Sequence, residues 1–373
     1  LETTDGVVAD GVGRMMDGGD FGDSYNYGPP ASDVIVDTPS SVAVEATLPG
    51  PVRGAVTVTR RYDWPRGVAP DGSARTTDMQ PTDVTMVLEL RADEPFVRIG
   101  LRFDNRSDDH RVRFHAPLPH RADTSHAEGQ FAVVERGMVG EGGYHEEPVA
   151  TYPAHSWVDA GGLAVLLGHL AEYELTGSAD RELAITVLRS IGLISRNDNP
   201  YREDPAGPEL PIPSGQMRGP WRFDFGLYPH AGDWLSGGVA AAAERYRHPF
   251  LVTHGAGGGE APWPPERAGD DGVRLDGDAV VLSSLRRRDE GWIEARVVNL
   301  AGDRRSAALS AEIIEAREAD LRGAPGASVV LDANGAIRLD LGPAEIRTLQ
   351  LRRREPSLPR ADLLDAAGPR QNG

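Results

Sequence analysis

The chain contains no cysteine and no lysine. The absence of cysteine excludes disulfides, thiol nucleophiles and cysteine-ligated metals, and we expect a cytoplasmic location. All 39 basic residues are therefore arginines, and they oppose 57 acidic residues to give a formal charge of -18. A field of that sign repels nucleic acid and anionic membranes, and no basic run is strong enough to overcome it. We therefore expect neither nucleic acid nor a membrane as a partner.

Long apolar runs are also missing. No stretch approaches the roughly 18 apolar residues of a membrane-spanning helix, and no basic-then-apolar targeting segment follows Leu1. Because the first residue is not methionine, we expect a processed product or the later part of a longer chain. The length of 373 residues is sufficient for two or three domains of roughly 100–200 residues each.

Alternation of apolar and polar residues is the main pattern of the first third of the chain. Apolar residues occupy every second position of 84–90 and again of 97–103. This period of two is typical of half-buried strands. Turn residues separate such runs at roughly ten-residue spacing, as in an all-β sandwich. An Ala-rich stretch near 234–247 is the one convincing helix.

Composition divides the chain into two modules. The Gly- and Pro-rich segment 254–272 is a linker by composition. We therefore expect a large β-sandwich at 1–253, a smaller β-sandwich at 273–354 and a disordered tail at 355–373. A long irregular segment, 195–220, interrupts the first module, and a loop of that length is usually functional or wraps another surface.

No self-contained catalytic motif is present. The sequence has no G-x-S-x-G nucleophile motif, and no phosphate-binding loop lies between a strand and a helix. His115, His120 and His126 could ligate a metal together with Asp123, but their spacing matches no helical metal signature. We therefore expect histidines that form hydrogen bonds.

Two pairs of carboxylates could serve general acid–base chemistry, Asp20 with Asp23 and Glu146 with Glu147. Such pairs arise by chance in a chain with 57 acidic residues. Aspartates in a Gly-rich turn also commonly cap their own backbone. The residues alone therefore indicate two β-sandwich modules with no assigned catalytic residue.

The order of several short segments resembles the C-terminal half of bacterial glycoside hydrolase family 38, the α-mannosidases, which include mannosylglycerate hydrolases. Between Asp17 and Arg353, the segments in order are "DGGDFGDSYNYGPP", "FAVVERG", "ELAITVLRSIGLISR", "GQMRG", "FGLYPHAGDW", "AERYRHPF", "VVLSSLRRRDEGWIEARVVNLAG" and "GPAEIRTLQLRR". The resemblance implies a large galactose-mutarotase-like supersandwich followed by a smaller β-sandwich.

The same resemblance implies that the catalytic machinery is absent from this chain. Family members begin with an α/β-barrel that carries the zinc ligands, an aspartate nucleophile and an acid/base aspartate. We therefore expect the C-terminal portion of a zinc-dependent retaining α-mannosidase, with the zinc ligands outside this chain. Its partners would be the N-terminal catalytic domain and a mannoside, and homo-oligomers are compatible with the resemblance. The isolated chain is expected to be inactive.

The first of these segments can be compared residue by residue. In the family, a tyrosine of a G-x-x-Y-x-[FY]-x-P loop reaches from the sandwich into the active site. Gly22, Tyr25, Tyr27 and Pro29 match that pattern. The match implies a sugar contact for Tyr25 and a packing role for Tyr27. The chemistry is suitable, because a tyrosine offers an apolar face to a pyranose ring and a phenol to its hydroxyls.

Five further polar residues remain open in their roles. Asp20 and Asp23 would either accept hydrogen bonds from sugar hydroxyls or brace the loop. We expect Arg136 and Arg189, which lie in strand-like runs, to be buried and paired structural arginines. Gln216, on the long irregular segment, is expected to line an interdomain groove.

Two other functions stay open. The aromatic loop and the long irregular segment could form the sugar groove of a non-catalytic carbohydrate-binding or assembly module. A mutarotase-like epimerase would instead need a His and a Glu that converge in one cleft of the sandwich.

Overall fold

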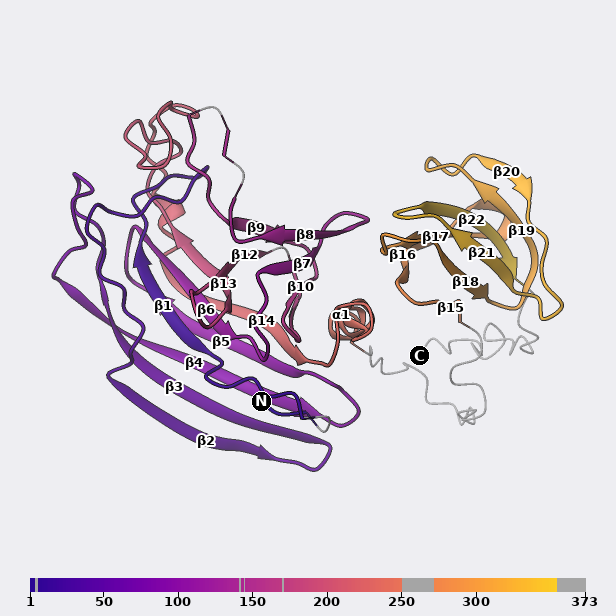
Figure 1. The fold of residues 1–373 in the computed structure, drawn as a ribbon, viewed down its shortest axis with the longest axis horizontal. Coiled ribbons are helices and arrows are strands. Elements are labelled where there is room, and N and C mark those ends of the chain that lie inside the picture. Colours follow the sequence, from indigo (N-terminus) through magenta and orange to yellow (C-terminus); the bar gives the residue numbers. More distant parts are fainter. Residues whose placement is uncertain (4–5, 141, 144, 170, 250–271, 354–373) are drawn as a thin grey trace, which may run out of the picture. The chain divides into compact units, whose positions relative to one another are not determined.

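The computed structural model describes residues 1–3, 6–140, 142–143, 145–169, 171–249 and 272–353. The chain divides into two compact units, Leu1–His254 and Gly255–Gly373. The described parts of both units consist mainly of β-strands (Figure 1), which confirms the all-β prediction. The expected linker 254–272 lies outside the described residues except for Gly272, and the expected tail 355–373 lies outside them entirely.

The larger unit is built from two antiparallel sheets. Its strands are β1 (Arg14–Gly19), β2 (Ser41–Pro49), β3 (Arg53–Pro65), β4 (Met79–Arg91), β5 (Val97–Asn105), β6 (His110–Pro117), β7 (Thr124–Glu128), β8 (Val133–Gly137), β9 (Thr151–Ala154), β10 (Trp157–Ala160), β11 (Leu163–Leu167), β12 (Ala171–Thr176), β13 (Glu182–Ser190) and β14 (Gly219–Pro229). The strand order is β2-β3-β4-β5-β14-β11-β10-β7-β8 in the nine-stranded sheet and β1-β6-β13-β12-β9 in the five-stranded sheet.

The core of the larger unit lies between these sheets. Ile99 and Leu101 are buried on β5 at alternate positions, as the period of two predicts. Phe114 of β6 meets Phe225 of β14 with ring centres 4.7 Å apart, so the core joins the two sheets. Each such fully buried side chain contributes about 1.5–3 kcal/mol through removal of apolar surface from water.

The helix α1 (Val239–Arg247) begins later than the stretch 234–247 that the sequence indicated. The backbone N–H of Ser236 donates to the Asp233 carboxylate at 2.8 Å and closes a separate turn. Gly238 then takes a left-handed conformation, with φ of 65°, directly before the helix. This conformation is easy for glycine and interrupts helical geometry, so the residues before Val239 are not helical.

The helix α1 packs on the face of the nine-stranded sheet that points away from the main core. Its residues Val239, Ala242 and Tyr246 form a second apolar cluster with Ala164 and Leu166 of β11. The helix contacts β10, β11 and β14. Among the described residues, no helix is both long and apolar enough to cross a lipid bilayer.

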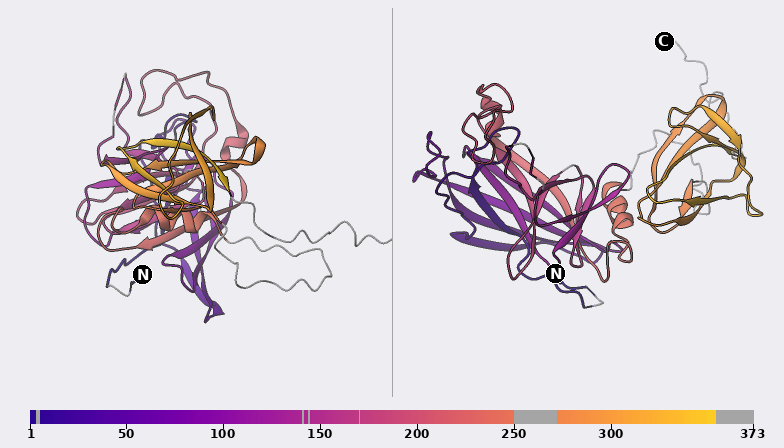
Figure 2. Two further views of the ribbon diagram at one scale, coloured as in Figure 1. Left: turned by 90° about the vertical axis from the view of Figure 1, so that its right-hand side faces the viewer. Right: turned by 45° about the horizontal axis from the view of Figure 1, so that its top comes forward.

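The smaller unit is a two-layer β-sandwich (Figure 2). Its strands are β15 (Arg274–Asp276), β16 (Val280–Arg287), β17 (Trp292–Asn299), β18 (Arg305–Ser310), β19 (Ile313–Ala319), β20 (Pro325–Ser328), β21 (Ile337–Leu341) and β22 (Ile346–Arg353). The order is β15-β18-β21 in one sheet and β16-β17-β22-β19-β20 in the other. The core between the two sheets includes the fully buried side chains of Val297, Leu309 and Leu351.

Candidate functional site

The loop of residues 20–30, here named the Tyr25 loop, directly follows β1. The backbone N–H of Phe21 donates to the carbonyl of Gly28 at 2.6 Å, and that of Asp23 donates to the carbonyl of Asn26 at 3.0 Å. Gly22 permits this close turn, because a Cβ atom at that position would lie 2.1 Å from the Asn26 carbonyl oxygen. The start of the loop is fixed, since β1 pairs with β6 along its whole length.

The buried carboxylate of Asp20 ties the loop to the five-stranded sheet. Its Oδ1 accepts hydrogen bonds from the backbone N–H groups of Gly22 and Gly28 at 3.0 and 3.3 Å. Its Oδ2 accepts a hydrogen bond from Nε of Arg189 in β13 at 2.7 Å. Burial lowers the pKa of Arg189, but the neighbouring Asp20 carboxylate outweighs that effect and raises it. The Asp20–Arg189 contact is therefore an ion pair.

The carboxylate of Asp23 is fully buried and holds the tip of the loop. Its Oδ1 accepts from the backbone N–H groups of Tyr25 and Asn26 at 2.9 and 3.0 Å. Its Oδ2 accepts from Nη2 of Arg202 at 2.6 Å and from the backbone N–H of Arg196 at 2.8 Å. Burial raises the pKa of Asp23, but these hydrogen bonds, led by that of Arg202, outweigh it and lower the pKa. Asp23 is therefore ionised at neutral pH.

Both aspartates brace the loop, which is one of the two roles that the sequence left open. Every carboxylate oxygen of Asp20 and Asp23 already accepts a hydrogen bond from the protein. A sugar hydroxyl would have to displace one of these donors or share its oxygen with it. The direct sugar contact of the two aspartates stays a prediction.

The two tyrosines of the loop differ in exposure. Tyr25 is 55% exposed, and the guanidinium of Arg202 lies 5.9 Å from its ring centre. Tyr27 is packed, with the Arg111 guanidinium 3.6 Å and the Tyr201 ring 6.2 Å from its ring centre. Burial raises the pKa of Tyr27 to about 12. Tyr27 thus packs as the resemblance implies, whereas Tyr25 keeps an open side chain whose sugar contact stays a prediction.

The long irregular segment 195–220 packs against the Tyr25 loop (Figure 1). The guanidinium of Arg196 lies 3.6 Å from the ring centre of Phe21. Nη1 of Arg202 donates a hydrogen bond to Oδ1 of Asn26. Arg196 and Arg202 were missed in the sequence, because Arg202 and Asp23 are 179 positions apart. No local pattern marked them, because the segment is about as rich in arginine as the chain as a whole.

Gln216 and Arg136 both form hydrogen bonds within the larger unit, and the interdomain groove expected at Gln216 stays a prediction. Gln216 accepts a hydrogen bond from the backbone N–H of Asp109 at 2.9 Å and donates one to its carboxylate at 2.8 Å, both within the larger unit. Arg136 is half-buried and donates to the carbonyl of Pro153 at 2.9 Å. It packs on the ring of Tyr152 and has no carboxylate partner among the described residues. The expected buried ion pair is therefore wrong for Arg136, while Arg189 is paired.

Of the candidate metal-binding histidines, His115 forms a side-chain hydrogen bond, and Nε2 of His126 lies 3.5 Å from Oε2 of Glu135. Nδ1 of His115 lies 2.7 Å from Oε2 of Glu182, and Nη2 of Arg14 donates to the same oxygen at 2.7 Å. Burial lowers the pKa of His115. Its side chain is 2% exposed, so this His–Glu pair is closed to a substrate and does not serve a mutarotase-like reaction. In the part of the chain that the structure describes, no group of three His, Asp or Glu residues is arranged to hold a metal.

The second pair of carboxylates lies beside the long irregular segment. The backbone N–H of Glu147 donates to the carbonyl of Tyr201 at 2.8 Å. Glu146 and Glu147 are exposed and line a hollow of about 290 Å³ together with Tyr201 and Arg202. These carboxylates are therefore open to solvent close to the residues that brace the Tyr25 loop.

Comparison with known proteins identifies relatives of this chain. No family model matches it. The chain is 29% identical over 168 residues to a protein of Halalkalibacterium halodurans described as "Putative mannosylglycerate hydrolase", a match that covers 43% of this chain and 17% of that protein. Its fold is similar to that of a glycosyl hydrolase family 38 protein from Enterococcus faecalis, with a TM-score of 0.70, 17% identity and coverage of 91% of this chain and 40% of that one.

An α-mannosidase from Enterococcus faecalis V583 has a similar fold, with a TM-score of 0.69 and 18% identity, over 91% of this chain and 38% of that one. This chain therefore spans less than half the length of each of these three proteins. The two solved structures establish the shared fold, and the sequence match extends the likeness to a hydrolase. Together they confirm that the chain resembles part of glycoside hydrolase family 38.

Proposed function

We propose that this chain is the C-terminal β-sandwich portion of a zinc-dependent, retaining α-mannosidase-type glycoside hydrolase of the cytoplasm. In this proposal it packs on an N-terminal catalytic barrel and supplies one wall of the pocket for a mannoside. The matches support the proposal, because more than half of each solved structure lies outside the part that this chain covers.

The observation that carries the proposal is the exposed Tyr25 side chain on a loop with a rigid base. Two buried carboxylates, Asp20 and Asp23, hold that base through Arg189 and Arg202. Ion pairs with a buried carboxylate are costly to desolvate and are weak devices for stability alone. Their presence under an open tyrosine fits a loop that must hold one conformation. A fixed side chain also loses less conformational entropy when a ligand binds.

Tyr25 would act on the sugar by contact and orientation. Its ring offers an apolar face to the C–H groups of a pyranose, and its phenol exchanges hydrogen bonds with hydroxyls. The two carboxylates of a retaining reaction are assigned to the catalytic barrel. The described residues do not fit a zinc site, because no suitable group of three ligands is present and both loop aspartates are bound by arginines. We therefore derive no catalytic step through a metal held by this chain.

Hydrolysis of p-nitrophenyl α-mannoside tests the proposal. The purified chain should release no p-nitrophenol above the rate in buffer. In a longer protein that joins this chain to its catalytic barrel, Tyr25→Ala should lower kcat/KM by about tenfold or more, since a ring contact and a hydrogen bond are lost. Phe131→Ala, which removes another exposed aromatic ring (43% exposed), should leave kcat/KM unchanged. Hydrolysis by the isolated chain would contradict the proposal.

An open tyrosine beside a polar hollow also suits the alternative, a non-catalytic carbohydrate-binding module. Calorimetric titration of the purified chain with mannose and short mannosides separates the two functions. Saturable binding that is lost in Tyr25→Ala would favour the module. Absence of binding, with intact folding, would favour a wall that needs the catalytic domain to complete the pocket.

A further inference from the structure

A second hollow lies on the outer face of the nine-stranded sheet, beside α1. In the described part of the larger unit, α1 packs over β10, β11 and β14, and the hollow is lined by residues of β3, β4, β5 and β14 together with Tyr246 of α1. The hollow has a volume of about 400 Å³. Gly100 lies in its floor, directly between Val87 of β4 and Asp224 of β14 in the strand register. The missing side chain of this glycine leaves the space that its neighbours surround.

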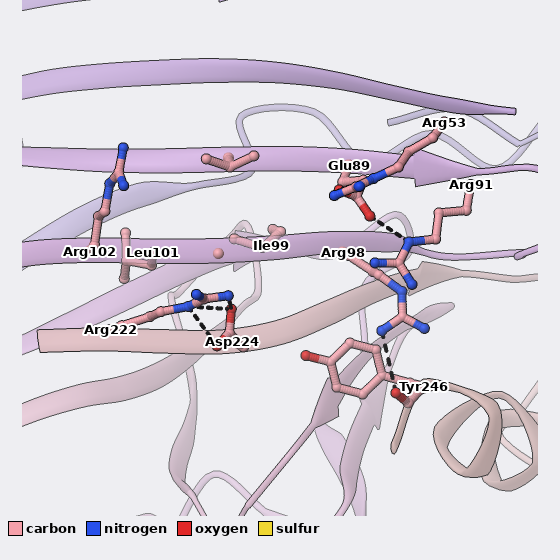
Figure 3. Close-up of a pocket in the computed structure, with 12 residues that line it drawn as sticks. Arg53, Glu89, Arg91, Arg98, Ile99, Leu101, Arg102, Arg222, Asp224 and Tyr246 are labelled. Atoms are coloured by element: carbon pink, nitrogen blue, oxygen red, sulfur yellow. Dashed lines mark hydrogen bonds and ion pairs between the residues drawn. The ribbon is translucent and has the colours of Figure 1, made fainter. Parts of the chain in front are cut away.

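Arginines dominate the lining of this hollow, which we name the Arg102 hollow. Figure 3 shows Arg102 and Arg222 at one end of the hollow and the other three arginines at the opposite end; the five are Arg53, Arg91, Arg98, Arg102 and Arg222. Two carboxylates, Glu89 and Asp224, also line it. Arginines outnumber carboxylates in this lining, whereas acidic residues outnumber arginines in the chain as a whole, whose formal charge is -18. The positive charge of the hollow therefore does not follow from the average composition.

The carboxylates of this region are already engaged by arginines. Glu89 binds Arg53 and Arg91, and Asp224 binds Arg222. Arg102, by contrast, has no carboxylate partner among the described residues and its side chain is exposed. Its guanidinium therefore keeps all its donors for a ligand, and the neighbouring guanidiniums retain the donors that their carboxylates do not use.

One of the five guanidiniums, that of Arg98, is held in place before any ligand binds. Arg98 donates two hydrogen bonds to Glu94 at 2.7 and 2.8 Å. Its guanidinium lies 5.1 Å from the ring centre of Phe96 and 4.9 Å from that of Tyr246, and the side chain is 16% exposed. A side chain fixed in this way loses little entropy when a ligand binds, so Arg98 offers a preorganised donor at this end of the hollow.

We propose that the Arg102 hollow binds a small organic anion of about monosaccharide size that carries a carboxylate or a phosphate group. A planar guanidinium donates two parallel hydrogen bonds to either group, and the charge of the hollow complements both. Its volume lies at the small end of the range of ligand pockets, about 300–1,000 Å³. This site goes beyond the proposed hydrolase function, since it involves neither Tyr25 nor its loop.

Isothermal titration of the full chain at low salt tests the site with three probes. Glucose 6-phosphate and glucuronate carry the two candidate groups on one sugar frame, and glucose carries neither. We expect saturable binding of at least one anion, no binding of glucose, and weaker binding as ionic strength rises. The tighter of the two anions identifies phosphate or carboxylate as the preferred group. Absence of saturable binding for both anions would overturn the proposal.

Variants then locate the binding. Arg102→Gln should raise the dissociation constant of the anion by about tenfold or more, because a charge-assisted hydrogen bond is lost. Gly100→Thr fills the hollow without a change of charge, and the nearest atom to its Cβ would be 3.4 Å away, so the chain should fold and lose binding. Arg106→Gln is the matched control, since Arg106 pairs with Asp104 outside the hollow, and it should bind as the parent does.

Equal affinity in all three variants, with melting temperatures near that of the parent, would place the anion elsewhere and overturn the proposal. Because the readout is binding of charged sugars, its failure leaves the mannoside proposal for Tyr25 untouched. Conversely, if Tyr25→Ala left hydrolysis unchanged, the mannoside proposal would fail and the proposal for this hollow would stand.

Discussion

Arg202 and Asp23 are 179 positions apart in the chain and form an ion pair of 2.6 Å beneath the Tyr25 loop. The side chains are 3% and 0% exposed, so water does not screen the pair. The Asp23 carboxylate also accepts hydrogen bonds from the backbone N–H groups of Tyr25 and Asn26 at the loop tip. This ion pair is one of several contacts that join the long irregular segment to the loop that presents Tyr25.

Arg202→Met should destabilise the larger unit by about 3–5 kcal/mol, because the buried Asp23 carboxylate loses its charged partner. Urea unfolding followed by tryptophan fluorescence measures the change. Arg61→Met is the control, since Arg61 pairs with Asp83 at the surface with side chains 48% and 58% exposed, and its effect should stay below about 1 kcal/mol. Equal effects of the two substitutions would contradict a buried role for Arg202.

Asp23 should also contribute to the acid lability of the fold. Burial raises its pKa, but Arg202 and the backbone donors outweigh burial, so the pKa of Asp23 in the folded state lies below its ordinary value of 3.8. The folded state then binds fewer protons than the unfolded state. The stability that Asp23 contributes is therefore complete above pH 3.8 and is lost as the pH falls through the lowered pKa of the folded state. Asp23→Asn should have a flatter dependence of unfolding free energy on pH below about 4.

Glu128, at the end of β7, should have the opposite pH dependence. Burial, and then the negative charge of Glu244, raise the pKa of Glu128 from 4.5 to about 7, against a smaller opposing effect of Arg247. The folded state binds the extra proton, so stability is complete below 4.5 and falls as the pH rises towards about 7. Glu128→Gln should remove this loss. A parent protein whose unfolding free energy is flat over that pH window would contradict the assignment.

Gly22→Ala should distort the Tyr25 loop. The new Cβ would lie 2.1 Å from the backbone carbonyl of Asn26 and 2.7 Å from the backbone nitrogen of Gly28, and backbone atoms cannot swing aside as a side chain does. We expect a loss of about 1–3 kcal/mol, measured by thermal unfolding. Gly137→Ala, with nothing within 4 Å of its Cβ, should be nearly neutral.

Most of the fold could be predicted from the sequence, because strand periodicity is a local property. The alternation at 97–103 predicted a strand, and β5 buries those same apolar positions. The start of the helix was predicted too early in the chain. The Ala-rich composition does not reveal the left-handed Gly238 or the turn that Asp233 and Ser236 close before it. Local composition indicates a helix well, but the capping geometry decides its first residue.

The candidate site was only partly predictable. The spacing of Gly22, Tyr25 and Tyr27 is local and indicated an aromatic loop. Which carboxylate meets which arginine depends on chain segments that are far apart in sequence. The sequence therefore determined the strands, the aromatic loop and the excess of acidic charge. Only the tertiary structure decided that Asp23 meets Arg202 and that Arg136 meets no carboxylate, because ion pairing depends on distance in space and on burial, which strand periodicity does not encode.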